Sequence, residues 1–191
     1  MFNQYITNCD ERIVSIKNAL TLSRNKWTIM DLSGVATAEM RVAGEDENQM
    51  LNMRLRSVML EKKAYKLLPF ESMADAEKVI QHLSDNIKTI DVLTTISRKV
   101  YHNELSGLFK ETEWVAHRTG LEEQRAYIKT MMTRFQSQYA DRCATHTKEL
   151  LRLSQHGSAE EKRKATECMK QSVQMELERV RTGGANPLAS R

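Results

Sequence analysis

The sequence predicts an all-α fold, an elongated antiparallel bundle of about five helices with seams like those of a coiled coil. Aromatic residues, which favour strands, make up only 6% of the 191 residues, and the two prolines stand far apart at positions 69 and 187. Hydrophobic residues make up 40% and charged residues 28%, which is too apolar for a disordered chain and too polar for a membrane protein. Apolar residues also recur at alternating spacings of three and four, the period of a helix face.

The first helix is predicted at about residues 3–27 by a single apolar face. This face contains Phe2, Ile6, Cys9, Ile13, Ile16, Leu20 and Trp27, with Ser23 interrupting it. After Trp27 the pattern loosens, and Gly34 and Gly44 bracket the segment that follows. We therefore expect a loop up to about residue 45, with one short helix at 36–42 at most.

The second helix is predicted at about 46–68, and it ends there because Leu68 precedes Pro69. The third begins after Pro69, where Ser72 and Asp75 have the spacing of a capping box. It carries the cleanest heptad pattern of the chain: Met73, Ala76, Ile80, Leu83, Ile87 and Ile90. A break is expected at Gly107, before a short helical piece with Leu108, Phe109 and Trp114.

A long fourth helix is predicted at about 120–155, starting at the capping-box pattern of residues 119–122. Gly157 ends it, and Ser158 with Glu161 makes a further capping box for a fifth helix. The apolar face of that helix contains Ala165, Met169, Val173, Leu177 and Val180. We expect one helical bundle over 1–182, with a division into 1–68 and 70–182 as the alternative, and a flexible tail at 183–191.

No motif of the sequence indicates an enzyme or a cofactor. The patterns GxxxxGK[ST], GxGxxG and HExxH do not occur, and no histidine follows a glutamate at the Glu-x-x-His spacing of di-iron bundles. The three cysteines are odd in number and widely spaced, which favours a reducing compartment. No apolar run is long enough for a signal peptide or a transmembrane helix, so we expect a cytoplasmic protein. This expectation includes a protein that works in the cytosol of a host cell.

Two groups of side chains resemble sites but have simpler explanations. The first offers donors that suit zinc: Cys143, His146, His156 and Cys168. Its spacing matches no common zinc finger, and Cys143 and His146 share an apolar seam, so core packing is the favoured explanation. The second could serve acid–base chemistry beside Trp114: Glu111, Glu113 and His117. Exposed helix charges are the favoured explanation.

Basic residues are concentrated in the second helix, although the net charge of the whole chain is only +4. Residues 51–68 hold five basic groups and one acidic group: Arg54, Arg56, Lys62, Lys63 and Lys66 against Glu61. Such a face can bind the phosphates of an acidic membrane or of nucleic acid. The alternative is a solvated face without a partner.

These observations favour a non-enzymatic structural, scaffold or adaptor protein that acts by self-association and helix docking, next to an anionic membrane surface if the basic face is used. Its composition is similar to that of viral matrix proteins and other helical coats. The expected partners are a second copy, other helical proteins, and an acidic membrane or nucleic acid, with no small-molecule substrate. A nucleic-acid-binding protein and a metal-dependent enzyme are the alternatives.

Self-association is expected through the fourth helix. A helix of about 35 residues spans about 52 Å, which is longer than a compact domain of this size needs, so part of it should project. The projecting part would expose an apolar stripe for a second copy: Tyr139, Leu150 and Leu153. The alternative is that the fifth helix folds back and covers this stripe with Met169, Val173 and Leu177.

Overall fold

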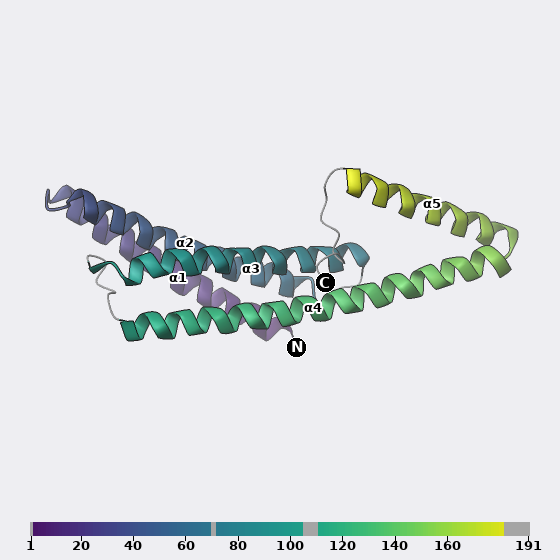
Figure 1. Cartoon of the computed structure of the whole chain (residues 1–191), viewed down its shortest axis with the longest axis horizontal. Helices are drawn as coiled ribbons and strands as arrows, with labels where there is room; N and C mark the ends of the chain where they lie inside the picture. The colour runs from purple at the N-terminus through teal and green to yellow at the C-terminus, as the bar shows by residue number, and fades with distance from the viewer. Residues whose placement is uncertain (1, 70–71, 105–110, 182–191) are drawn as a thin grey trace. The chain divides into compact units, whose positions relative to one another are not determined.

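The computed structural model of the chain describes residues 2–69, 72–104 and 111–181. These residues form five α-helices and no strand, so the predicted all-α helical bundle is confirmed (Figure 1). The helices are α1 (Phe2–Leu32), α2 (Ala38–Lys66), α3 (Met73–Tyr101), α4 (Glu111–His156) and α5 (Ala159–Arg181). The expected tail at 183–191 and the expected break at Gly107, with Leu108 and Phe109, lie outside the described residues.

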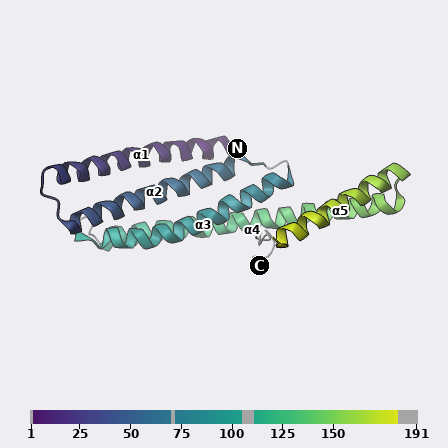
Figure 2. The same cartoon turned by 90° about the horizontal axis from the view of Figure 1, so that it is seen from above.

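The chain divides into two compact units, Met1–Met132 and Thr133–Arg191, with the boundary inside α4. In the first unit α2 lies between α1 and α3, as Figure 2 shows, and it packs against both. The core of this unit follows the apolar face of α3, where Leu83, Ile90 and Leu93 are almost completely buried. Of the predicted heptad, Ala76, Ile80, Leu83 and Ile90 are buried, Ile87 is half-buried, and the side chain of Met73 is not described.

The loop predicted between the first two helices is wrong, as is the separate short helix at 36–42. α1 continues to Leu32, only residues 33–37 separate it from α2, and Gly44 lies inside α2. Gly34 makes the turn with a positive φ of 71°, which a glycine adopts without steric cost. Thr37 then caps α2, because its side-chain oxygen accepts a hydrogen bond from the Met40 amide at 3.3 Å.

Gly44 is helical because a tertiary contact outweighs its low helix propensity. The Trp27 ring of α1 lies directly over it, and a Cβ atom at position 44 would come within 2.6 Å of the ring atom Cδ2. Trp27 is held there by its Nε1, which donates to Glu47 Oε2 at 2.9 Å, and by the Lys26 ammonium 4.5 Å from a Trp27 ring centroid. The absent side chain therefore lets α1 and α2 approach closely.

Substituting Gly44 with alanine is expected to lower the free energy of unfolding by about 1–3 kcal/mol, because the Trp27 ring must leave its place. Gly120 of α4 is the matched control, since an added Cβ there meets no atom within 4 Å. Gly120→Ala should raise stability by about 0.5–1 kcal/mol through helix propensity alone. Urea unfolding of both variants checks this, and a stabilising Gly44→Ala would show that the ring contact is unimportant.

α4 is longer than predicted, because it begins at Glu111 and passes through Gly120 without a break. The capping-box pattern at 119–122 is therefore not a helix start. The preceding turns are fixed instead by ring contacts of the buried Trp114, whose centroid lies 6.0 Å from that of Tyr101 and 6.4 Å from that of His117. Packing of aromatic side chains thus extends the helix toward its N-terminus.

The second unit is a helical hairpin: α4 ends before Gly157 as predicted, and α5 turns back after it, as in the fold-back alternative (Figure 1). The predicted capping box is present: the Ser158 amide donates to Glu161 Oε2 at 2.8 Å, and the Glu161 amide donates to Ser158 Oγ at 3.4 Å. Ala165 is buried near this turn, whereas Val173 and Leu177 farther along α5 are exposed. The hairpin therefore leaves part of the apolar face of α5 exposed.

No helix in the described part of the chain has an apolar stretch long and uncharged enough to cross a membrane.

Candidate functional site

The five basic residues of α2 do not form one surface in the structure. Arg56, Lys63 and Lys66 are exposed and share the outer face of the helix with Met59. Lys62 is only 21% exposed and forms an ion pair with Asp10 of α1, so it links two helices. Arg54 is also exposed, but it lines a cavity between helices and does not share the outer face. Three of the five cations therefore form one outer surface that an anionic partner can reach.

The side chains predicted for self-association on α4 differ in their accessibility. Tyr139 is buried, with 7% of its surface exposed, whereas Leu150 and Leu153 are half-buried. These three residues do not form a continuous exposed stripe.

The zinc-like residues are not assembled into a site. Cys143 is half-buried, whereas His146, His156 and Cys168 are exposed. No cluster of three or more potential metal ligands occurs within residues 2–69, 72–104 and 111–181. In the acid–base group, Glu111 and Glu113 are exposed, and only His117 turns inward, where its Nε2 lies 3.0 Å from Ser97 Oγ of α3.

The outer face of α1 carries an exposed apolar stripe that the sequence analysis missed. Cys9, Ile16, Leu20 and Ser23 are the buried residues of this helix. A second set of residues recurs at spacings of three and four on the opposite face, and we call it the α1 stripe: Val14, Asn18, Leu22, Asn25, Ile29 and Leu32. The four apolar members are exposed by 57%, 70%, 66% and 82% in chain order. α1 is therefore apolar on two opposite faces, of which one is covered.

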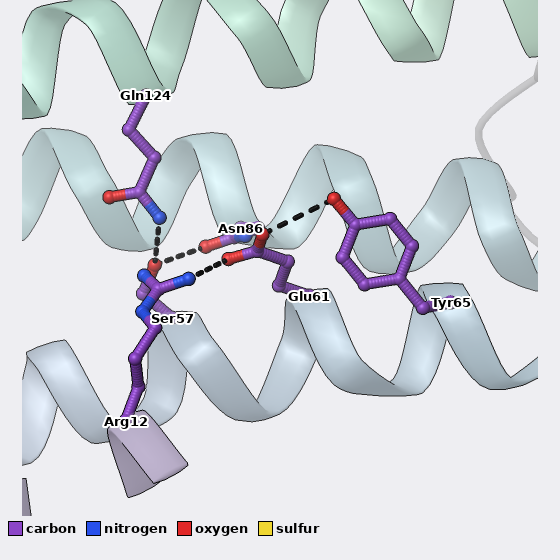
Figure 3. A network of polar contacts seen from close by, with 6 residues as sticks. All are labelled: Arg12, Ser57, Glu61, Tyr65, Asn86 and Gln124. Carbon is purple, nitrogen blue, oxygen red and sulfur yellow. Dashed lines mark hydrogen bonds and ion pairs between the residues drawn. The ribbon is translucent and has the colours of Figure 1, made fainter. Parts of the chain in front are cut away.

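A polar network crosses the interior of the first unit (Figure 3). Ser57 of α2 donates to Asn86 Oδ1 of α3 at 2.7 Å, while Gln124 Nε2 of α4 lies 3.5 Å from Ser57 Oγ. Asn86 is fully buried, and its Nδ2 has no hydrogen-bond partner among the described residues. A buried donor without a partner is costly, so the Nδ2 group offsets part of what the Ser57 hydrogen bond contributes.

Glu61 of α2 makes a second set of polar contacts, which joins α1 to α2 beside the first set (Figure 3). It accepts a hydrogen bond from Arg12 at 3.1 Å and another from the Tyr65 hydroxyl at 3.3 Å. The buried Tyr65 ring also stacks on Tyr5, with 5.2 Å between the centroids. Burial, the largest cause, raises the pKa of the Tyr65 hydroxyl far above its usual range, so this hydroxyl stays protonated as a donor.

Beside this network lies a cavity of about 310 Å³ whose wall contains residues of α1, α2, α3 and the first part of α4. All of its lining residues belong to the first unit. The polar lining consists of Arg12, Ser15, Arg54, Ser57, His117 and Gln124. Its remaining large side chains are aliphatic: Ile16, Val58, Leu93 and Leu121.

His117 is uncharged at neutral pH because burial, followed by the nearby charge of Arg54, lowers its pKa from 6.5 to about 4. Its imidazole also stacks on Tyr101, with the centroids 5.0 Å apart. A neutral histidine held between a guanidinium and a tyrosine ring offers a hydrogen bond without adding charge.

Stability should therefore depend on His117 below neutral pH. Its folded-state pKa of about 4 lies below 6.5, so the unfolded chain takes up the proton first. The stabilisation is complete above about pH 6.5 and is lost as the pH falls toward 4. Urea unfolding at pH 7 and pH 4.5 measures the effect. Between these pH values, the free energy of unfolding of His117→Gln should fall by about 1–2 kcal/mol less than that of the wild type.

His146→Gln is the control for this measurement, because His146 is exposed on the same helix. It should retain the full pH dependence of the wild type. An identical acid response in all three proteins would mean that His117 is not kept neutral by the fold.

Comparison with known protein families, with curated protein sequences and with solved structures found no match to this chain.

Proposed function

We propose that the chain is a non-enzymatic helical scaffold or adaptor that acts by pairing with a second copy through the α1 stripe. The observation that carries this proposal is the large exposure of Val14, Leu22, Ile29 and Leu32 on one helix face. Four large apolar side chains this exposed on one helix face favour a surface that meets a partner. This surface replaces the one on α4, where Tyr139 is buried.

A second copy fits the stripe because its residue order is nearly the same in both directions. From the central Leu22, asparagines stand four residues before it and three after it, and the aliphatic Val14 and Ile29 stand eight before and seven after. Two antiparallel α1 helices that cross at Leu22 would therefore pair Val14 with Ile29 and Asn18 with Asn25. Such self-complementarity is what a twofold interface requires.

One charge on the stripe face favours this antiparallel arrangement. Glu11 is exposed and has no ion-pair partner among the described residues. A parallel pair in register would place the two copies of Glu11 against each other, and like charges in contact are unfavourable. The antiparallel pair separates Glu11 from its copy. The asparagine pairs can satisfy each other's amide groups inside the interface.

The size of the stripe indicates moderate affinity. Full burial of a Val, Leu or Ile side chain contributes roughly 1.5–3 kcal/mol. The antiparallel register buries Val14, Leu22 and Ile29 of each copy, and these six side chains can offset an association cost of about 4–15 kcal/mol. We therefore expect a dimer that dissociates at micromolar concentrations.

Sedimentation velocity from about 1 µM to a few hundred µM at physiological salt tests the proposal. The sedimentation coefficient should rise with concentration from the monomer to the dimer value. A monomer over the whole range would remove self-association as the function.

Binding to an acidic membrane is a second candidate function, supported by the exposed Arg56, Lys63 and Lys66 around Met59 on the outer face of α2. Cations that surround an exposed apolar side chain suit the lipid headgroup region. Changing the three cations to glutamine should weaken pelleting with phosphatidylserine vesicles at low salt by about 1 kcal/mol per charge. Equal pelleting of wild type and variant would exclude this surface, and a loss seen only with RNA would assign it to nucleic acid.

A further inference from the structure

We propose that the cavity of the first unit binds a small organic anion, with Arg54 as the residue that holds its carboxylate or phosphate group. The cavity has a volume of about 310 Å³ and lies among four helices. This is the lower end of the range of small-molecule sites, about 300–1,000 Å³. The site is independent of the α1 stripe, because the only α1 residues in its lining are Arg12, Ser15 and Ile16.

Charge is the first argument for an anion. The lining contains Arg12 and Arg54, and no described residue of the lining is acidic. Arg12 is already paired with Glu61 at 3.1 Å. Arg54 has no ion-pair partner among the described residues, although it lies close enough to His117 and Tyr101 to influence both rings. An unpaired guanidinium at the wall of a concave site is a receptor for a planar carboxylate or a phosphate.

Neutral hydrogen-bond donors surround this charge. Gln124 Nε2 belongs to the lining and lies 3.5 Å from Ser57 Oγ, a long contact that the Gln124 amide can exchange for a better one, whereas the Ser57 hydroxyl keeps its hydrogen bond to Asn86 Oδ1 at 2.7 Å. The Ser15 hydroxyl also faces the cavity and has no partner in the described part of the chain. The wall can therefore donate several hydrogen bonds to one anionic group without first breaking a strong internal bond.

The rest of the wall determines the kind of anion. Ile16, Val58, Leu93 and Leu121 present aliphatic surface opposite the polar groups. An inorganic ion would leave this aliphatic surface exposed to water, whereas a ligand with a compact apolar part would cover it. The ligand class is thus a small amphipathic acid, with one anionic group and a hydrocarbon or aromatic part.

The test uses the full chain and three small probes of similar shape: benzoate, phenyl phosphate and the neutral benzamide. Titration followed by two-dimensional NMR should show saturable shifts around the cavity with at least one of the two anions, and much weaker binding of benzamide. Comparing benzoate with phenyl phosphate separates a carboxylate site from a phosphate site. No saturation by either anion up to about 10 mM, or equal binding of benzamide, would overturn the proposal.

Variants locate the binding. Arg54→Gln should weaken the binding of the anion by at least about tenfold, whereas Arg56→Gln, on the outer face of the same helix, should leave it unchanged. Gly120→Leu keeps every charge and adds a bulky side chain at the cavity wall, where an added Cβ meets no atom within 4 Å. It should abolish binding while the circular-dichroism spectrum stays helical.

Equal weakening by the two arginine variants would mean diffuse surface attraction, and it would overturn the proposal. Unchanged binding in a folded Gly120→Leu protein would do the same. Neither result bears on self-association, which is measured without a ligand.

Discussion

Replacing both Leu22 and Ile29 of the α1 stripe with glutamate is expected to raise the dissociation constant of the dimer by at least about a hundredfold. Both side chains are about two-thirds exposed in the single chain, so the change should leave the fold intact. In the dimer, the antiparallel arrangement would bury Leu22 against its own copy and Ile29 against Val14. A carboxylate at either position would then be buried without a partner, which is strongly unfavourable. Sedimentation equilibrium of the variant measures the effect.

The control for this experiment also exchanges exposed apolar side chains for glutamate, but away from the stripe. Met59 of α2 and Val92 of α3 are exposed by 43% and 47%. Their double variant should associate as the wild type does. If both double variants dissociate alike, the loss reflects added negative charge, and the α1 stripe is not the interface.

Changing the buried Asn86 to aspartate is expected to lower the free energy of unfolding by about 3–5 kcal/mol at neutral pH. The side chain has 0% exposure, and among the described residues only Ser57 donates a hydrogen bond to it. The second carboxylate oxygen would take the place of Nδ2, which has no partner in the described part of the chain. The new charge would thus be desolvated and only partly compensated.

The pH dependence of this variant has a definite sign. Burial raises the folded-state pKa of the new carboxyl above the value of the unfolded chain, about 3.9. The variant therefore loses stability relative to wild type as the pH rises above about 4, and acid restores part of it. Urea unfolding at several pH values measures this. Asn52→Asp, at an exposed position of α2, should change stability little, and an equally small effect at position 86 would contradict the buried network.

The parts of the fold that depend on local chemistry could be predicted from the sequence. The Ser72 cap of α3 is present, with Oγ accepting from the Asp75 amide at 3.0 Å, and so is the Ser158 box of α5. The end of α2 before Pro69 also follows from local sterics. Such signals act within a few residues, so no knowledge of the packing is needed.

The errors arose where distant residues decide the local structure. The sequence pattern predicts a loop at Gly44, but the Trp27 ring makes it a close-contact position inside α2. The capping-box pattern predicts a helix start at Gly120, yet the packing of Trp114 continues α4 through it. The charge pattern predicts a solvent-facing Lys62, although it pairs with Asp10, 52 positions away.

The two candidate sites were hidden for different reasons. The α1 stripe is visible in the sequence, because Val14, Leu22, Ile29 and Leu32 recur at helical spacing. The apolar pattern through Ile16 and Leu20 is more regular, and it masks the second pattern. The cavity has no sequence pattern, because its lining residues come from four helices that are far apart in the sequence. Only the packing of the helices places Arg54 beside His117.

Disulfide trapping at position 22 tests the central claim most directly. In a background with Cys143→Ser and Cys168→Ser, the remaining Cys9 is buried, and burial raises the pKa of its thiol to about 11, so it should not react at neutral pH. Leu22→Cys would place two thiols at the crossing point of the antiparallel α1 pair. We predict that mild oxidation forms a disulfide-linked dimer much faster than with Asn52→Cys, an exposed position on α2. Equal rates at the two positions, or no linked dimer at position 22, would contradict pairing through α1.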